Sequence, residues 1–343
     1  MDYAVDPGAA GRHLQADVDL MQQDAPPPLP LEKSARIVLL GGAGLVGQNL
    51  VILLKAEGFR RILVIDKHAA NLAILERLHP DVETVLADMA DPGVWEDRIG
   101  DAAAAVMLQA QIGGDDAAQF RRNNIDATER ALAACRRHGV AYVVHTSSSV
   151  INSMARDLYT ESKAQQERLV VASGLAQCVL RPTLMFGWFD RKHLGWLARF
   201  MQRSPVFPIP GSGRYMRQPL YVMDFCRIIL ACLHRRERGT AYNITGRERV
   251  DYIDIIRAIK QTTGAKSAIV RIPYVVFRWL LQAYAVVDRD PPFTTSQLRA
   301  LATPDEFELI PWWDIFGVPA TPFEDAIRQT YGPGPYRDVV LDF

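Results

Sequence analysis

Tyr159 and Lys163 are the residues whose types and spacing most directly suggest chemistry. They stand four positions apart within Leu158–Ala172, a stretch that predicts a helix, so both side chains lie on one helical face. A free tyrosine has a pKa of about 10, too high for a base at neutral pH, and a neighbouring lysine cation lowers it. Such a phenol could take a proton from an alcohol, or return one to a carbonyl, while a hydride moves.

Hydroxyl side chains come just before this helix. The run His145-Thr-Ser-Ser-Ser-Val150 follows the predicted strand Ala141–His145, at the strand end where a doubly wound sheet presents its ligand crevice. One of these serines could donate a hydrogen bond to the reacting oxygen and polarise it. A serine-rich strand end also serves as a turn or a helix cap, so the pattern leaves both roles open.

The segment GGAGLVG, residues 41–47, lies between a predicted strand, Arg36–Leu40, and a predicted helix, Leu45–Glu57. It fits G-x-G-x-x-G when read from Gly42 and G-x-x-G-x-x-G when read from Gly41. Both patterns bring the backbone close to a pyrophosphate at the positive N-terminus of the following helix. The segment therefore predicts a dinucleotide site and leaves the choice of pattern open.

Asp66 ends the second predicted strand, 19 residues beyond Gly47. A carboxylate at this place accepts hydrogen bonds from an adenosine ribose and repels a 2′-phosphate, so the sequence favours NAD over NADP. Lys67 follows directly and keeps NADP as the less favoured alternative. An oxidised nicotinamide would add positive charge near Tyr159 and favour its phenolate further.

Short apolar runs alternate with helical stretches over residues 36–180. This alternation predicts an α/β fold of Rossmann type, in which helices cover both faces of a doubly wound parallel sheet. A smaller mixed α/β region on the C-terminal side is expected to bind the substrate. The predicted strands are Arg36–Leu40, Arg61–Ile65, Val82–Leu86, Ala103–Leu108, Ala141–His145 and Ala176–Leu180, and the predicted helices include Leu45–Glu57, Asp115–His138 and Leu158–Ala172.

The same alternation predicts the division of the chain into a tail, a cofactor-binding domain and a substrate-binding region. Residues 1–33 are expected to form a flexible tail, and residues 34–186 an NAD-binding Rossmann domain on which 219–247 packs. Residues 187–218 and 248–343 are expected to form the substrate-binding region.

Composition excludes several classes of protein. Lys plus Arg and Asp plus Glu both number 39, so no overall field attracts nucleic acid. The four cysteines have no C-x-x-C spacing and the histidines are scattered, which predicts a reducing cytoplasm and no metal site. The apolar run Tyr274–Val287 is too short to span a bilayer, so no transmembrane segment is expected. It predicts a buried helix or a lid over an apolar ligand.

On these motifs, the chain resembles the extended short-chain dehydrogenase/reductase family, in its NAD-dependent epimerase/dehydratase group. The resemblance implies the G-x-x-G-x-x-G pattern and makes Tyr159 and Lys163 the catalytic pair. Ser148 then matches the catalytic hydroxyl, with Ser147 as a one-residue alternative. Asn124, in a run similar to the family's N-x-x-G-T, matches the supporting member of the tetrad.

The resemblance covers residues 35–247 and implies contacts with NAD and with the substrate. The implied cofactor contacts are Gly41, Gly44, Leu45, Val46, Gly47, Asp66, Asp88, Met89, Leu108, Gln109, Ala110, Lys163 and Pro182. The implied substrate contacts are Ser148, Ser149, Tyr159 and Arg217. Arg217 would grip a substrate diphosphate. A homodimer formed through the helices 115–138 and 158–172 is also implied.

The positions after the catalytic hydroxyl separate the members of this family. Sugar-nucleotide dehydratases carry Asp-Glu there, because elimination of water needs its own acid and base, whereas this chain has Ser149 and Val150. Dehydration is therefore disfavoured, and the reactions still open are oxidation and reduction through a 4-keto intermediate. The leading hypothesis is therefore an NAD-dependent epimerase or oxidoreductase acting on a nucleotide sugar.

Two departures from the family keep alternatives open: the stretch between Ser148 and Tyr159 is short, and a late nucleotide-binding segment of many epimerases is missing. Asp288–Thr295 replaces this segment, and the apolar Tyr274–Val287 before it is similar to the 3β-hydroxysteroid dehydrogenase branch, whose substrates are lipidic. An NAD(P)-dependent dehydrogenase or reductase of a lipidic or steroid-like alcohol is the second hypothesis. The ending Phe316–Phe323 is similar to atypical members such as the complex I accessory subunit. A cofactor-binding subunit without turnover is the third.

Overall fold

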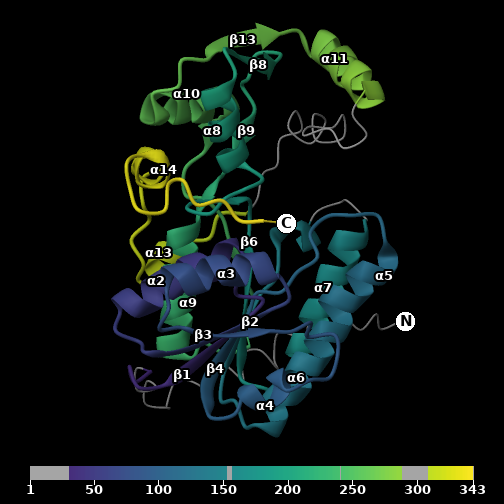
Figure 1. Ribbon diagram of the computed structural model, residues 1–343, viewed down its shortest axis with the longest axis vertical. Helices are drawn as coiled ribbons and strands as arrows, with labels where there is room; N and C mark the ends of the chain where they lie inside the picture. Colours follow the sequence, from purple (N-terminus) through teal and green to yellow (C-terminus); the bar gives the residue numbers. More distant parts are fainter. Residues whose placement is uncertain (1–30, 153–156, 240, 288–307, 343) are drawn as a thin grey trace, which may run out of the picture.

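The computed structural model describes residues 31–152, 157–239, 241–287 and 308–342 (Figure 1). Most of the predicted N-terminal tail and the segment Asp288–Thr295 lie outside the described residues. In the described part, a central sheet with helices on both faces carries a second group of helices and short strands at one end. No helix in these ranges is both long enough and apolar enough to cross a membrane.

Seven parallel strands form the central sheet, in the order β11-β6-β5-β4-β1-β2-β3. The chain builds outward from β1 in both directions, so the topological switch point, where such sheets bind ligands, lies between β1 and β4. The predicted parallel sheet is confirmed, with strand ends that differ from the prediction by at most two residues. The strands are β1 Arg36–Leu40, β2 Arg61–Asp66, β3 Glu83–Leu86, β4 Ala102–Met107, β5 Val143–Thr146, β6 Gln177–Pro182 and β11 Ala241–Ile244.

The inner strands carry apolar side chains on both sides, because both faces of the sheet are covered. Ile37 and Leu39 belong to the core on one face, and Val38 and Leu40 to the core on the other. The helices that contribute to the first core are α2 Leu45–Ala56, α3 Ala69–Leu78 and α9 Val222–Arg235. Those that contribute to the second are α4 Trp95–Arg98, α6 Ala127–Arg137 and α7 Leu158–Val171.

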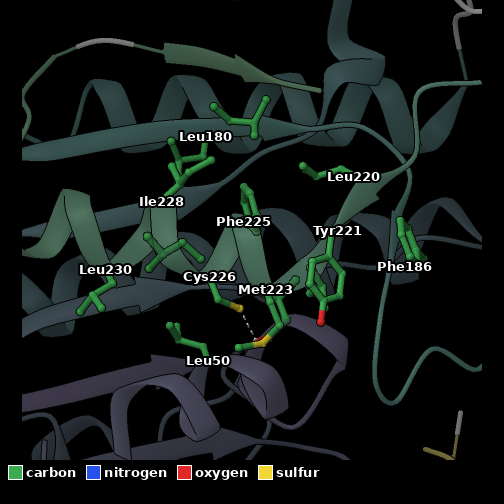
Figure 2. Close-up of a cluster of buried hydrophobic side chains, with 14 of the residues drawn as sticks. Leu50, Leu180, Phe186, Leu220, Tyr221, Met223, Phe225, Cys226, Ile228 and Leu230 are labelled. Carbon is green, nitrogen blue, oxygen red and sulfur yellow. Dashed lines mark hydrogen bonds between the residues drawn. The ribbon is translucent and has the colours of Figure 1, made fainter. Parts of the chain in front are cut away.

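Helix α9 returns the chain to the sheet after the second group has begun. Its Phe225, Cys226 and Ile228 are fully buried, in one cluster with Leu50 of α2 and Leu180 of β6 (Figure 2). Strand β11 then adds to the sheet beside β6. The elements that follow β6 therefore complete the core on which the cofactor half rests.

The second group consists of short strand pairs and helices. Strands β8 and β13 pair in parallel, as do β7 and β10, while β9 and β12 are antiparallel. The strands are β7 Met185–Phe186, β8 Val206–Pro210, β9 Met216–Arg217, β10 Leu220–Tyr221, β12 Val250–Asp251 and β13 Ala268–Ile272. The helices are α8 Leu194–Arg203, α10 Tyr252–Thr263, α11 Tyr274–Val287, α13 Trp312–Ile315 and α14 Phe323–Tyr331.

Helix α11 differs from the predicted buried helix, while the alternative of a lid over an apolar ligand stays a prediction. Figure 1 shows it at the far end of the second group, beyond β13. Val275, Val276, Trp279 and Leu280 are between 47% and 64% exposed. The prediction was wrong because apolar composition alone does not say whether a protein surface is available to cover the helix.

The C-terminal segment crosses back from the second group to the cofactor half. The Asn71 side chain, fully buried on α3, donates to the backbone carbonyl of Asp342 and accepts from its backbone N–H, both at 2.7 Å. Gln48 Nε2 donates to the backbone carbonyls of Asn71 and Ala43, at 3.1 and 3.3 Å. The chain end is thus linked by hydrogen bonds to the glycine-rich loop.

Asn71→Ala is expected to lower the free energy of unfolding by about 2 kcal/mol, because two part-buried backbone groups of Asp342 lose their partners. Urea unfolding at neutral pH measures the loss. Asp342→Ala is the matched control, since both bonds use its backbone, and it should stay within about 0.5 kcal/mol of wild type. Equal losses in the two variants would contradict this account of the link.

Candidate active site

The glycine-rich loop turns the chain from β1 into α2 with no room for side chains at two positions. Gly41 has φ +76°, and a Cβ on it would lie 2.5 Å from the backbone nitrogen of Gln109. A Cβ on Gly47 would lie 2.1 Å from the carbonyl oxygen of Gly42. Gly44, the N-cap of α2, has an extended backbone and open space at its Cβ position. This open face at a helix N-terminus fits the approach of a pyrophosphate.

Gly47→Ala and Gly44→Ala are expected to separate stability from cofactor binding. The first places a Cβ against backbone and should lower the unfolding free energy by about 2 kcal/mol or more. In Gly44→Ala the added methyl group meets no protein atom, so the unfolding free energy should stay unchanged. NAD affinity should fall about tenfold, since the methyl group occupies the space where the pyrophosphate is expected to bind. Thermal unfolding and NAD titration measure both effects. Equal NAD affinity in Gly44→Ala and wild type would refute the placement of the pyrophosphate.

Asp66 fixes the loop at the end of β2. Its Oδ2 accepts from the backbone N–H of Ala43 at 2.9 Å, and its Oδ1 accepts from that of His68 at 3.0 Å. Each carboxylate oxygen keeps a second lone pair, which suits a ribose hydroxyl. Lys67 turns away from this carboxylate and donates to Asn123 Oδ1 at 2.6 Å.

Asp88 and Met89 follow β3, where the adenine contact was predicted. Asp88 accepts from the backbone N–H of Ala90 at 3.0 Å and from Arg122 at 3.2 Å, while Met89 is buried. Arg122 also forms an ion pair with Asp91 at 2.5 Å. The sequence did not identify Arg122 as a partner of Asp88 and Asp91, because these residues lie 34 and 31 positions away from it in the chain.

Leu108, Gln109 and Ala110 follow β4 at the switch point of the sheet. Leu108 N–H donates to Leu40 O at 2.7 Å, which continues the β1–β4 pairing beyond the strand end. Gln109 is buried, and its Nε2 donates to Thr128 Oγ1 at 3.2 Å. This segment forms a floor beside the glycine-rich loop, since a Cβ on Gly41 would come within 2.5 Å of the backbone nitrogen of Gln109.

Asn124 lies in a π-helical turn, η1 Arg121–Asp126, between α5 Ala117–Phe120 and α6. The predicted continuous helix Asp115–His138 therefore contains a change of winding at this residue, as is frequent at functional sites. The fully buried Asn124 side chain accepts from Gln111 N–H at 2.6 Å and donates to Ser162 Oγ at 2.9 Å. It holds the segment after β4 against α7, and its bond goes to Ser162 instead of to Lys163.

The hydroxyls at the end of β5 have different surroundings. Ser148 Oγ accepts from Val150 N–H at 3.4 Å, and a hydrogen bond with Ser148 lowers the pKa of Tyr159. Ser147 Oγ is buried without a hydrogen-bond partner among the described residues. The contact with Tyr159 favours Ser148 over Ser147 as the hydroxyl that works beside the phenol.

Tyr159 lies half-buried in the first turn of α7, which Asp157 caps by accepting from Thr160 N–H at 2.7 Å. Burial raises the pKa of Tyr159, the hydrogen bond with Ser148 opposes this rise, and the Asp157 carboxylate adds to it. The net pKa lies above the ordinary value, which differs from the lowering predicted from Lys163. A phenol in this state holds its proton at neutral pH and is ready to donate it.

Lys163 is buried, and its ammonium group donates hydrogen bonds to two neutral acceptors. Its Nζ donates to the backbone carbonyl of Thr146 at 2.9 Å and to Gln166 Oε1. Burial lowers the pKa of Lys163 to about 7, against an opposing effect of Glu167. Because the Lys163 ammonium faces these acceptors, burial outweighs the effect of its charge on the pKa of Tyr159.

Gln166 completes this network and was missed from the sequence. The fully buried amide donates from Nε2 to Thr128 Oγ1 at 2.8 Å and to Gln109 O at 3.3 Å. Its Oε1 must then face Lys163, since an ammonium can only donate. The spacing of three residues on the helix after Lys163 was the available signal.

Buried polar atoms without protein partners gather at the ends of β4 and β5. Among the described residues they include Gln109 Oε1, Thr146 Oγ1, Ser147 Oγ and both ring nitrogens of His145. Burial, and then the nearby Lys163, lower the pKa of His145, so its imidazole is neutral. Unpaired polar atoms at a sheet edge are costly without a ligand, which fits a polar cofactor at this place.

The remaining predicted residues lie around this centre. Val46 and Ser149 are buried, Leu45 is half-buried, and Pro182 ends β6 opposite Ile244 of β11. Arg217 lies on β9, where its Nη1 donates to the Met216 carbonyl at 3.1 Å.

Residues 37–245 match the family described as the NAD dependent epimerase/dehydratase family. A 3 beta-hydroxysteroid dehydrogenase/Delta 5→4-isomerase of Mycobacterium tuberculosis is 27% identical over 284 residues, which cover 73% of this chain and 75% of that protein. A dTDP-glucose 4,6-dehydratase of Streptomyces niveus is 27% identical over 269 residues, covering 69% and 80%. A double mutant of the dTDP-glucose 4,6-dehydratase DesIV from Streptomyces venezuelae, crystallised with NAD, has a TM-score of 0.68 at 20% identity, over 86% of this chain and 95% of that chain. The match over 37–245 covers more than half of the chain, which belongs to the NAD-dependent epimerase/dehydratase family.

Proposed function

We propose that this enzyme oxidises and reduces a secondary alcohol and its ketone with NAD, using Tyr159 as the acid and base. The observation that carries the proposal is the position of Tyr159 beside Ser148, whose hydroxyl lowers the pKa of the phenol, one helical turn from the buried Lys163. The chemistry that NAD supplies when bound is the uptake or return of a hydride. Gly41, Gly44 and Gly47 with Asp66 would hold it, above the floor formed by Gln109.

The protein's own task in this reaction is to move one proton at the substrate oxygen. Ser148 orients that oxygen by donating a hydrogen bond, and Tyr159 gives it a proton in the reducing direction. In the oxidising direction Tyr159 has to lose its proton first. Because burial raises the pKa of Tyr159, this direction depends on positive charge from Lys163 and from the oxidised cofactor.

Dehydration is disfavoured at this site. Ser149 and Val150 begin the 3₁₀ turn η2 Ser149–Asn152, and neither side chain can act as an acid or a base near neutral pH. Elimination of water would need such groups in addition to Tyr159. The reaction class that remains is oxidation, reduction or epimerisation at one carbon.

We propose a nucleotide sugar as the substrate. The dTDP-glucose 4,6-dehydratase relative acts on such a compound, and Arg217 on β9 offers a cation to a diphosphate. The second candidate is a lipidic or steroid-like alcohol. It is favoured by the 3 beta-hydroxysteroid dehydrogenase relative, which is matched over a slightly larger share of this chain.

A substrate panel tests the proposal. The purified enzyme with NAD or NADH is offered UDP-, GDP- and TDP-sugars, and separately a 3-hydroxysteroid and a long-chain β-hydroxy ketone. Nicotinamide absorbance follows net oxidation or reduction, and NMR of the products detects epimers, which have the same mass as the substrate. Conversion of nucleotide sugars alone supports the first substrate class, conversion of the lipids alone supports the second, and no conversion of either counts against the proposal.

We further propose a cytoplasmic homodimer. The four cysteines are free and buried, which suits a reducing compartment. Helix α7 and the helical segment of η1 and α6 are the elements that would pair between two copies. We also propose that residues 34–186, with 219–247, form the NAD-binding domain and that 187–218 and 248–343 form the substrate-binding region.

A further inference from the structure

Helix α11 is apolar on two opposite sides. Tyr274, Phe277 and Leu281 are half-buried and recur at helical spacing, so they form the side that faces the protein. Val275, Val276, Trp279 and Leu280 are exposed and form a second stripe, about 140° wide at about 100° per residue. We call this stripe the outer face of α11. A helix that is apolar all round is stable only when both sides are covered.

Two more exposed apolar side chains lie on the strand pair at the same end of the molecule. Val206 of β8 and Val270 of β13 are 43% and 42% exposed, and these strands lie at the same end of the molecule as α11 (Figure 1). Clustered exposed apolar side chains of this kind mark an interaction surface, whereas single ones do not.

The charged residues from Lys266 to Val287 have one sign. Lys266, Arg271 and Arg278 are exposed, and no acidic residue occurs in the sequence from Lys266 to Val287. Arg278 is exposed and lies about 60° around the helix from Val275, the nearest residue of the outer face, and its long side chain can reach lipid headgroups while its stem stays in apolar surroundings.

We infer that the outer face of α11 docks on an anionic lipid bilayer, with the helix lying in the plane of the interface. Its fourteen residues span about 21 Å, less than the apolar thickness of about 30 Å, so the helix rests on the membrane instead of crossing it. Apolar side chains on one side with flanking cations are the features of such helices, and Trp279 suits the headgroup level.

The charge pattern argues against a second copy as the occupant. A twofold contact through α11 would bring the cations of one copy against the same cations of the other. An anionic membrane surface attracts them instead, by about 1 kcal/mol for each Lys or Arg near it. The surface is separate from Tyr159 and Lys163, so docking does not depend on the proposed reaction.

Co-sedimentation with vesicles tests the inference on the full chain. The wild type is expected to bind vesicles of equal parts phosphatidylcholine and phosphatidylglycerol, and to bind pure phosphatidylcholine at least tenfold more weakly. Trp279→Glu should weaken binding to the anionic vesicles at least tenfold, and Arg271→Gln with Arg278→Gln should weaken it by about tenfold. Val94→Glu makes a similar change at a residue that is 79% exposed on another element, and it should bind as the wild type does.

Further measurements distinguish a loss of membrane binding from misfolding and from dimer formation. NAD affinity and thermal unfolding, which should match the wild type in every variant, show that the chain is folded. Light scattering shows whether a second copy covers the outer face. The inference fails if the wild type does not bind anionic vesicles, if Trp279→Glu binds them equally well, or if Trp279→Glu splits a dimer.

Discussion

Tyr159→Phe is expected to lower kcat by about 10³-fold and to leave NAD affinity unchanged within about twofold. The phenol lies beside Ser148 and can exchange a proton with the substrate oxygen. Its ring is retained by phenylalanine, so the half-buried first turn of α7 should keep its packing. Steady-state kinetics on a substrate found in the panel, together with NAD titration, measure the two effects.

Tyr142→Phe, which removes a tyrosine hydroxyl away from the site, serves as the control for Tyr159→Phe. Tyr142 donates from its hydroxyl to the Glu237 carbonyl, at the opposite end of β5 from Ser148. Tyr142→Phe should therefore lower stability by about 1 kcal/mol and leave kcat unchanged. Turnover by Tyr159→Phe at a rate near the wild type would remove Tyr159 from the mechanism.

Lys163→Met is expected to lower kcat/KM by at least about 10²-fold and to change how stability depends on pH. Burial lowers the folded-state pKa of Lys163 from 10.5 to about 7. Between these values the unfolded chain binds a proton that the folded chain lacks, so the unfolding free energy of the wild type rises with pH through this window. The methionine variant lacks this rise.

The stability of the variant relative to the wild type should accordingly increase by a few kcal/mol as pH falls from about 10 to about 7. A pH-independent loss of about 1–3 kcal/mol accompanies the change, because Gln166 Oε1 and the Thr146 carbonyl lose a donor. Urea unfolding at several pH values separates the two contributions. Lys266→Met, at an exposed position, should stay within about 0.5 kcal/mol of wild type throughout. If the difference in unfolding free energy between Lys163→Met and the wild type were the same at every pH, burial would not lower the pKa of Lys163 in the folded protein.

The parts of the site that the sequence predicted are those set by local geometry. Gly41 and Gly47 have to be glycine because a tight turn brings backbone atoms within a few ångströms, and such turns have a recognisable spacing. Tyr159 and Lys163 share a helix face, so their separation in sequence fixes their separation in space. The continuous apolar runs predicted the parallel sheet for the same reason.

The parts that the sequence did not predict depend on distant segments. Gln166 is recognisable as a partner of Lys163 only when Thr128 and Gln109 are known to fix its amide. The π-helical turn at Asn124 arises where the segment after β4 meets α7. The pKa of Tyr159 depends on how deeply α7 is buried and on the direction of the Lys163 side chain. None of these follows from composition or periodicity.

The transfer of a hydride at this site is tested most directly with a substrate that carries deuterium on the reacting carbon. The enzyme is mixed with NAD and this substrate, the reaction is quenched during turnover, and the recovered cofactor is examined by mass spectrometry. We expect deuterium at C4 of the nicotinamide with the wild type and at most a trace with Tyr159→Phe. Product formed with loss of the deuterium to solvent, or equal labelling in the two proteins, would contradict the proposed reaction.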